Sequence, residues 1–439
     1  MKQNLKKMIS YYKPYLGVFF IDMFFALLAA VAALVIPLIV RYITSTVVYL
    51  PEQDAVKTIG KLALFMVALV AIQCYSNYYI SNNGHVMGAK IEYDMRAEIF
   101  AHYQKLSFAF YDNQKVGQLM ARITTDLFDI SELLHHGPEN IVISLIKIIG
   151  AFVIMMGISP KLTVAAFALV PFMIAYAYFF NKRMKKAFRQ NRIKIADINS
   201  QIEGNLSGIR VVKSFANEEV EQEKFSRGNK GFLDAKKNSY LFMGGYQAGL
   251  TAFTTLITVV VVIAGALWIP GGSVSITDLI TFLLYINVFT EPVKTLIDFT
   301  EQFQNGYSGF ERFMEILSIE PDISDEENAI DMENVRGEVE FQDVSFRYEE
   351  HLSRVLRHIN LKVPAGSYVA LVGTSGAGKT TLCSLIPRFY DVSEGRILID
   401  GCDIRHYKLK SLRDHIGIVQ QDVHQLPQGT LIPVKGDHG

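Results

Sequence analysis

The chain has 439 residues, which is more than one ordinary domain holds, so at least two domains are expected. Half of the residues are hydrophobic and only 20% are charged, a balance that argues against a wholly soluble protein of this length. The 43 basic and 43 acidic side chains cancel, so charge gives no support for nucleic acid as a partner. The three cysteines share no metal-ligand spacing and are interpreted as small buried hydrophobic residues: Cys74, Cys383 and Cys402.

Six stretches are long and apolar enough to cross a bilayer as helices, which takes about 20 residues. We expect these spans at about 16–42, 59–80, 141–158, 162–180, 241–269 and 279–303. The first is too long for a signal-peptide core and no cleavage site follows it, so it is predicted to remain as a span. Residues 1–320 are therefore predicted to form a transmembrane domain in the lipid bilayer.

Lysine and arginine are distributed unevenly among the connections between these spans. They are abundant in the N-terminal leader and in the two long connections, whereas the three short connections hold only Lys57 and Lys161. Basic loops favour the cytoplasmic side of a membrane. We therefore expect a multi-pass protein of the cell (cytoplasmic) membrane with both termini in the cytoplasm.

The two long connections, 81–140 and 181–240, keep apolar residues at spacings of three and four throughout. This periodicity predicts that the adjoining spans continue as helices beyond the membrane. We expect each pair to meet at a short turn, near 110–117 and 204–208.

Ionisable residues within or beside the spans are candidates for function: Asp22, Lys147, Asp298 and Glu301. Asp22 contacts either the cargo or an interfacial hydrogen-bond partner. Asp298 and Glu301 are expected to be solvated near the membrane edge.

The character of the chain changes after the last span. Residues 321–336 are acidic and without apolar periodicity, which predicts a linker. From 337 onward short apolar strands alternate with turns, a pattern typical of an α/β domain.

One motif in this second domain carries chemistry. The phosphate-loop pattern is matched by Gly373, Thr374, Ser375, Gly376, Ala377, Gly378, Lys379 and Thr380. Glycines let the backbone curl so that several N–H groups meet one phosphate, while Lys379 adds positive charge and Thr380 offers a hydroxyl to Mg²⁺. The preceding run 368–372 is predicted to be a buried strand, and a helix is predicted to begin after the loop.

Several stretches around this motif resemble the ABC exporter family. Residues 337–348 resemble the opening strands of its ATP-binding domain, 395–404 its next strand pair, 412–422 the segment that ends in its Q-loop, and 203–215 its second coupling region. The resemblance implies that Tyr348 stacks on adenine and that Gln421 contacts Mg²⁺. The implied nucleotide site comprises Tyr348, the loop residues, Thr381 and Gln421, with Thr380 and Gln421 on the metal.

The family resemblance also implies an architecture and a function. The fold is a membrane all-α six-helix exporter domain followed by an incomplete α/β P-loop nucleotide-binding domain at 337–439. The activity is ATP-driven export of a drug-like, lipid or peptide substrate by alternating access, with ATP and Mg²⁺ as cofactors. The implied partner is a second half-transporter, identical or different, because one half cannot enclose a pathway.

The sequence departs from the family after the Q-loop. A signature motif, a Walker B Asp–Glu pair and a switch histidine do not occur before Gly439, and neither 206–208 nor 397–400 replaces them. We therefore expect little ATPase activity from this chain alone. We also expect a loosely folded second domain, with uncovered apolar faces at 339–346 and 368–372.

Two alternative functions remain open. The missing motifs are compatible with a non-transporting regulatory or degenerate membrane protein. An importer permease is less favoured, because the membrane domain and the ATPase are fused in one chain.

Overall fold

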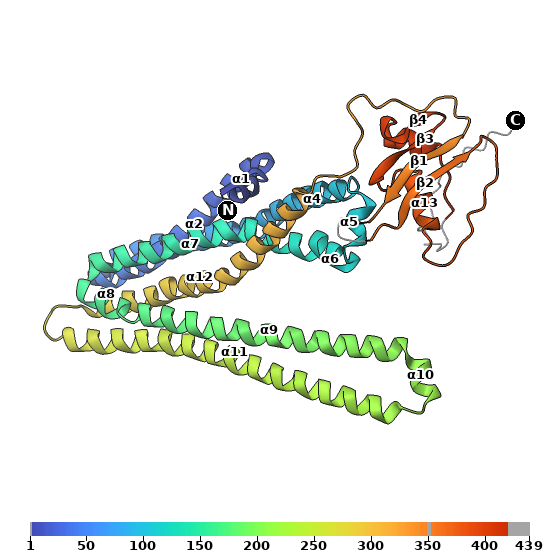
Figure 1. Cartoon of the computed structure of the whole chain (residues 1–439). Coiled ribbons are helices and arrows are strands. Elements are labelled where there is room, and N and C mark those ends of the chain that lie inside the picture. The colour runs from blue at the N-terminus through green and yellow to red at the C-terminus, as the bar shows by residue number, and fades with distance from the viewer. Residues whose placement is uncertain (1, 349–352, 420–439) are drawn as a thin grey trace. The chain divides into compact units, whose positions relative to one another are not determined.

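The computed structural model describes residues 2–348 and 353–419 and divides into two compact units (Figure 1). Unit 1 comprises Met1–Ala97 with Arg122–Glu315. Unit 2 comprises Glu98–Ala121 with Ile316–Gly439, so the turn between the second and third long helices belongs with the C-terminal domain.

Six helices are long and apolar enough to cross a membrane, as predicted. Each is counted as one helix even where a short irregular turn interrupts it, and each is 42 to 52 residues long. The six are Asn4–Tyr49, Glu52–Tyr103, Val116–Ile158, Pro160–Ser207, Glu218–Trp268 and Ile276–Leu317. At about 1.5 Å per residue, a helix of this length spans roughly 65–75 Å, about twice the hydrocarbon core of a bilayer. The helices therefore extend well outside the membrane, in line with the periodicity of the long connections.

The elements that make up these helices are separated by short interruptions. Their bounds are α1 (Lys2–Ser10), η1 (Lys13–Tyr15), α2 (Leu16–Ser45), η2 (Val47–Tyr49), α3 (Glu52–Tyr79), η3 (Ile80–Gly84), α4 (His85–Tyr103), α5 (Phe108–Asp112), α6 (Val116–Ala121), η4 (Arg122–Asp126), α7 (Leu127–Ile158), α8 (Pro160–Phe167), α9 (Val170–Ser207), α10 (Ile209–Ser214), α11 (Glu218–Trp268) and α12 (Ile276–Leu317). Two of the interruptions, η3 and η4, are single π-helical turns.

The sharp turn between α7 and α8 follows from the residues at its corner. Ser159 is extended and its hydroxyl accepts a hydrogen bond from the N–H of Leu162 at 3.5 Å, while Pro160 occupies the first helical turn. A serine N-cap followed by proline is a strong start signal for a helix.

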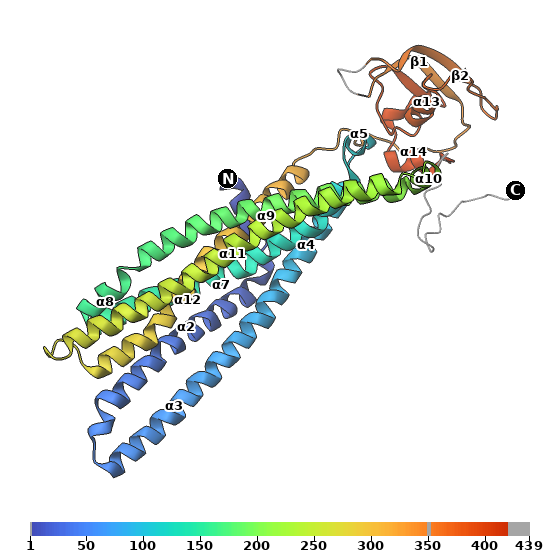
Figure 2. The ribbon, with the colours of Figure 1, turned by 90° about the horizontal axis from the view of Figure 1, so that it is seen from below.

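α9 and α11 lie side by side and are joined by α10 at their far end (Figures 1 and 2). α9 ends at Ser207, so the sequence Leu206–Gly208 terminates a helix here. The segment 206–208 therefore resembles a signature motif in amino-acid sequence alone, because here it is the end of a long helix.

The largest fully buried side chains of unit 1 come from α12. Phe282, Tyr285 and Phe289 are fully buried, and the Tyr285 hydroxyl donates to the Leu34 carbonyl at 2.5 Å. By contrast, none of the apolar 18-residue stretch of the Glu52–Tyr103 helix is buried within the chain. An apolar surface of this size needs lipid or another protein to cover it.

The ionisable residues noted in the spans differ in their surroundings. Asp298 is exposed and also accepts a hydrogen bond from the Tyr246 hydroxyl at 2.6 Å. Asp22 is fully buried, and within the described residues neither of its carboxylate oxygens has a hydrogen-bond partner. Lys147 and Glu301 are half-buried.

Unit 2 contains a four-stranded sheet in the order β2-β1-β3-β4, with every neighbouring pair antiparallel. Its elements are β1 (Val339–Phe346), β2 (Leu356–Val363), α13 (Lys379–Leu385), β3 (Glu394–Ile399), β4 (Cys402–Asp403), η5 (Ile404–His406) and α14 (Leu409–Asp414). In the register, Phe341 of β1 pairs with Leu361 of β2 and with Ile397 of β3.

Uncovered apolar faces were expected in this unit at 339–346 and 368–372, and the structure has them at the second segment only. The expectation is wrong for 339–346, because Phe341, Val344 and Phe346 are buried in a core with α13 and β3. It holds for 368–372, where Tyr368 and Val372 are almost fully exposed. The prediction of a buried strand at 368–372 is accordingly wrong: no strand is assigned there, since an apolar run becomes a strand only beside a pairing partner.

Two further expectations need correction. Cys74 and Cys383 are exposed rather than buried, because they lie on uncovered sides of α3 and α13. The acidic segment predicted to be a linker is part of unit 2 and contacts the rest of it: Ile330 pairs with Tyr407, and Asp331 forms a 2.7 Å ion pair with Lys408.

Candidate functional site

The phosphate loop lies between the exposed run 368–372 and α13. Gly376 and Gly378 have φ of +81° and +83°, a region that residues with a Cβ rarely adopt. A Cβ on Gly378 would also lie 2.8 Å from Cδ2 of Leu356. Glycine is therefore required at 378 by both the backbone and the packing against β2.

Lys379 is the first residue of α13 and its side chain folds back over the loop. Its Nζ donates to the carbonyls of Gly373 at 2.9 Å and Thr374 at 2.8 Å. Residues 373–377 are exposed, so the loop is accessible to a ligand. The arrangement fits a nucleotide whose phosphates are held by these N–H groups and by Lys379, with the exposed Thr380 hydroxyl available to Mg²⁺.

The structure brings Tyr348 to this loop, as the sequence suggested. The Tyr348 hydroxyl lies 2.9 Å from Oγ1 of Thr381, and its ring is 40% exposed. Its ring packs edge-to-face on Tyr390 with centroids 5.2 Å apart. An exposed ring anchored at its hydroxyl can offer a face to a flat base. The buried Thr381 side chain therefore positions Tyr348.

α5 packs on the same domain within unit 2. The ring centroids of Phe108 and Phe389 are 4.3 Å apart, and the Tyr390 hydroxyl donates to Oδ2 of Asp112 at 2.7 Å. Burial, followed by this hydrogen bond to a carboxylate, raises the pKa of Tyr390 above its ordinary value. Tyr390 thus contacts both Tyr348 and α5.

Two other predicted features have different outcomes. Gln421, expected on Mg²⁺, lies outside the described residues. Asp400, in the stretch that only resembles a Walker B strand, accepts hydrogen bonds from the N–H groups of Arg336, Gly337 and Glu338 at 2.8, 3.2 and 2.9 Å. Its carboxylate therefore has a structural role.

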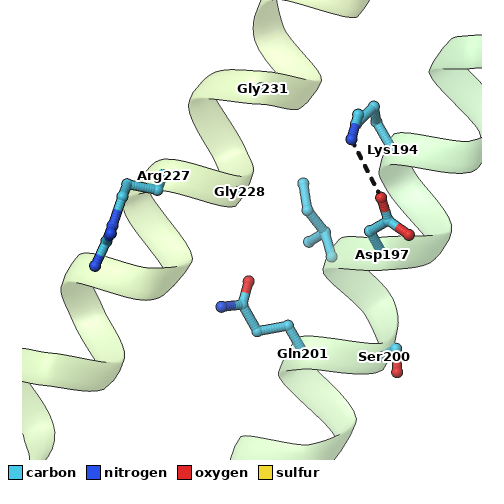
Figure 3. Close-up of a pocket in the computed structure, with 8 residues that line it drawn as sticks. Lys194, Asp197, Ser200, Gln201, Arg227, Gly228 and Gly231 are labelled. Atoms are coloured by element: carbon cyan, nitrogen blue, oxygen red, sulfur yellow. Dashed lines mark hydrogen bonds and ion pairs between the residues drawn. The ribbon is translucent and has the colours of Figure 1, made fainter.

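A groove also lies between α9 and α11 in unit 1 (Figure 3). It exists because Gly228 carries no side chain: a Cβ there would lie 2.9 Å from Oε1 of Gln201. Lys194 pairs with Asp197 on the same helix at 3.4 Å, and Arg227 extends away from α9. An exposed ion pair of this kind contributes little energy, so the groove offers no comparable chemistry.

Comparison with known proteins agrees with the geometry of the loop. Residues 19–293 match the model for the ABC transporter transmembrane region, and residues 356–433 match the model for the ABC transporter domain. The chain belongs to the ABC transporter family.

Two relatives from Bacillus subtilis (strain 168) illustrate this family membership. The uncharacterized ABC transporter ATP-binding protein YwjA is 42% identical over 428 residues, covering 97% of this chain and 73% of the relative. The putative multidrug export ATP-binding/permease protein YgaD is 32% identical over 426 residues, covering 95% and 73%. A putative multidrug export ATP-binding/permease protein of Staphylococcus aureus (strain NCTC 8325 / PS 47) is also 32% identical, over 437 residues.

As a member of the ABC transporter family, the chain combines a multi-pass membrane region with an ATP-binding domain. The sequence predicted a site at the phosphate loop and Tyr348, but it gave no prediction for Tyr390, which packs on Tyr348, or for Asp112, which bonds to Tyr390. Only the Phe389-Tyr390 pair, aromatic residues shortly after α13, gave any hint, because their contacts with α5 join positions 278 residues apart.

Proposed function

We propose that this chain is one half of an ATP-driven exporter that moves a drug-like, lipid or peptide substrate across the cytoplasmic membrane. The observation that carries the proposal is the joining, in one chain, of six membrane-crossing helices to a phosphate loop whose neighbour Tyr390 contacts α5. The names of the relatives from Bacillus subtilis and Staphylococcus aureus, which include multidrug export, support the direction of transport.

The residues of unit 2 suggest how nucleotide binding reaches the membrane helices. Lys379 and the loop N–H groups hold the phosphates, and the exposed Tyr348 face takes the base. Tyr348 packs on Tyr390, and Tyr390 holds Asp112 of α5. A shift of the domain on nucleotide binding would therefore move α5, and with it the long helices that α5 joins, between inward- and outward-facing states.

Dimerisation is part of the proposal. The exposure of the apolar helices supports dimerisation. The apolar 18-residue stretch of the Glu52–Tyr103 helix is wholly uncovered within one chain, and in each of the other five helices only 17–44% of the corresponding stretch is buried. Lipid covers part of this surface, and a second half-transporter, identical or different, covers the rest and completes the pathway.

Hydrolysis is the step for which these 439 residues lack recognisable groups. Mg²⁺ needs a carboxylate and the attacking water needs an orienting residue, and no Walker B Asp–Glu pair follows Lys379 in the printed sequence. We propose that a polypeptide of these residues binds ATP with Mg²⁺ but releases phosphate no faster than its Lys379→Ala variant.

The experiment that tests the proposal replaces Lys379 by alanine in the gene of the host cell, where the second half-transporter that supplies the missing hydrolytic groups is also present. Inside-out membrane vesicles should accumulate an amphipathic fluorescent dye on addition of Mg-ATP, and Lys379→Ala should reduce this accumulation at least tenfold because the loop loses its cation. Lys410→Ala is the matched control, since Lys410 is an exposed lysine of α14 in the same domain.

The same vesicles distinguish the alternative. Equal dye accumulation in wild-type and Lys379→Ala vesicles, together with retained binding of a fluorescent ATP analogue by the wild-type protein alone, would favour a non-transporting regulatory protein and contradict export.

A further inference from the structure

Three histidines from two helices gather in unit 1, far along the chain from the phosphate loop. His85 is the first residue of α4, and His135 and His136 are neighbours on α7. One possible ligand atom from each lies within 4.8 Å of the other two. Their ring centroids are 4.0 to 4.9 Å apart.

Two glutamates on α7 flank the histidines with helical spacing. Glu132, His135, His136 and Glu139 stand at i, i+3, i+4 and i+7, which places them on one face of the helix. A carboxylate oxygen of Glu132 lies 3.9 Å from Nε2 of His135, and the other lies 3.7 Å from Nε2 of His136. Among the described residues, the ion-pair partners of Glu132 and Glu139 are histidines only.

The hydrogen bonds of His135 fix which nitrogen is free. Nδ1 lies 2.8 Å from the carbonyl oxygen of Ser131, which can only accept, so Nδ1 carries the proton. In the neutral ring Nε2 then carries a lone pair. This atom is buried, and it has no hydrogen-bond partner in the part of the chain that is described. The side chain is only 2% exposed, so water does not satisfy it. A cation bound between this lone pair and the carboxylate of Glu132 would satisfy both groups.

His136 is oriented in the same way by a carboxylate. Its Nδ1 lies 3.5 Å from Oε2 of Glu139, while its Nε2 faces Glu132. Metal-binding histidines commonly donate their second nitrogen to a carboxylate or a backbone carbonyl, which fixes the ring and its tautomer. Both arrangements occur here, one on each neighbouring histidine.

The surroundings add a buried carboxyl group and a close approach of helices. The buried, unpartnered carboxylate of Asp22 lies 3.4 Å from where a Cβ on Gly84 would be, next to His85. A Cβ on Gly88 would lie 2.8 Å from Nδ1 of His135, so glycine is what lets α4 approach α7 here. The π-helical turn η3 ends directly before His85, and such turns are frequent at functional sites.

We propose that His85, His135, His136 and Glu132 form a binding site for a divalent transition-metal ion such as Zn²⁺. Imidazole nitrogens with one carboxylate suit zinc and its neighbours rather than Ca²⁺ or Mg²⁺, which prefer oxygen ligands. The carboxylates also exclude an anion as the occupant. Zn–N bonds of about 2.0–2.1 Å place the ring nitrogens roughly 3.4 Å apart, so ligand atoms that now lie within 4.8 Å of one another would move closer on binding.

The bound ion would join α4 to α7. It would thus brace the third long helix against the second. This site lies apart from the phosphate loop and its test contains no nucleotide, so the proposal stands or falls independently of ATP-driven export.

The test uses the full chain in detergent, stripped of metal by a chelator. We expect one equivalent of Zn²⁺ in competition with a chromophoric chelator, and strong visible absorption bands of tetrahedral Co²⁺ when cobalt replaces zinc. The double variant His135→Gln with His136→Gln should lose at least 100-fold in zinc affinity and the cobalt bands. Glu139→Gln should lose about 10- to 100-fold through loss of ring orientation.

His102→Gln is the matched control, since His102 lies on α4 like His85 but outside the cluster. A measurement without any variant covers the case of a misfolded double variant: the wild-type Tm should rise with zinc concentration as binding linkage requires. The proposal is overturned if the wild type binds no stoichiometric zinc, or if the double variant or Glu139→Gln binds it as tightly as His102→Gln does.

Discussion

Gly378 shows how strictly a single position in the phosphate loop is determined. Its φ of +83° costs a residue with a Cβ about 1–2 kcal/mol, and the added atom would also lie 2.8 Å from Leu356. We predict that Gly378→Ala lowers the affinity for a fluorescent ATP analogue by about tenfold or more, since the loop N–H groups no longer converge. Equilibrium fluorescence titration of the detergent-solubilised chain measures this.

Gly417→Ala provides the comparison for this substitution. Gly417 belongs to the same domain, its φ is not positive, and a Cβ there meets no atom within 4 Å. We expect its affinity to equal that of the wild type. Wild-type affinity in Gly378→Ala would contradict the requirement for glycine in the loop.

At the scale of residues, the sequence was most informative where a local motif carries the predicted chemistry. The phosphate loop depends on eight consecutive residues, and the structure agrees with the roles given to its glycines. Prediction failed where the partners are distant in the chain: Tyr390 with Asp112, and His85 with His135. The pair His135-His136 between Glu132 and Glu139 was a visible signal, but only the approach of α4 adds the third histidine.

Among the elements of unit 2, the β4–η5 corner depends on an ionised carboxylate. Burial opposes ionisation of Asp403, but hydrogen bonds from the Arg405 side chain at 2.6 Å and main-chain N–H at 3.0 Å outweigh it, so the pKa of Asp403 lies below its ordinary value. Hydrogen bonds from three N–H groups likewise outweigh desolvation and lower the pKa of Asp400. Both groups therefore stabilise the fold above their ordinary pKa of about 4, and this stability is lost as pH falls through the lower folded values.

We predict that Arg405→Gln destabilises this corner by on the order of 1 kcal/mol at pH 7, after allowing for the exposure of the arginine. The difference from wild type should disappear in acid, where Asp403 is protonated in both proteins. Hydrogen exchange of peptides covering 394–414, corrected for the intrinsic rate at each pH, measures it. Arg396→Gln is the control, because Arg396 donates to the neutral Gln342. A difference that persists unchanged below pH 3 would refute the role of Asp403.

At the scale of elements, periodicity predicted the six long helices because each is specified by its own apolar residues. The fate of 368–372 could not be predicted in this way, since an apolar run becomes a strand only when another strand lies beside it. Similarly, acidic composition suggested a free linker at 321–336, whereas its carboxylates are the partners of a neighbouring segment: Asp325 accepts from the N–H of Leu409 at 2.7 Å, and Asp331 pairs with Lys408.

For the molecule as a whole, orientation in the membrane follows from the distribution of basic residues. The α9–α11 hairpin ends in a segment rich in lysine and arginine, whereas the turn between α11 and α12 has none of either. Moving clustered basic side chains across a bilayer is unfavourable, so the α10 end is expected in the cytoplasm and the α11–α12 turn outside.

This expectation can be measured with single cysteines in a chain whose native cysteines are replaced by serine. Cys74 and Cys383 must be removed because they are exposed. Lys186 and Ser273 are suitable positions, as both side chains are exposed; Gly272 is avoided because its φ of +68° would strain a cysteine. In intact cells an impermeant maleimide should label Ser273→Cys and leave Lys186→Cys unlabelled. After the cells are opened both should react, because neither side chain is covered by the chain itself. Labelling of Lys186→Cys alone in intact cells would reverse the orientation. It would also move the phosphate loop, and with it any use of cytoplasmic ATP, to the wrong side of the membrane.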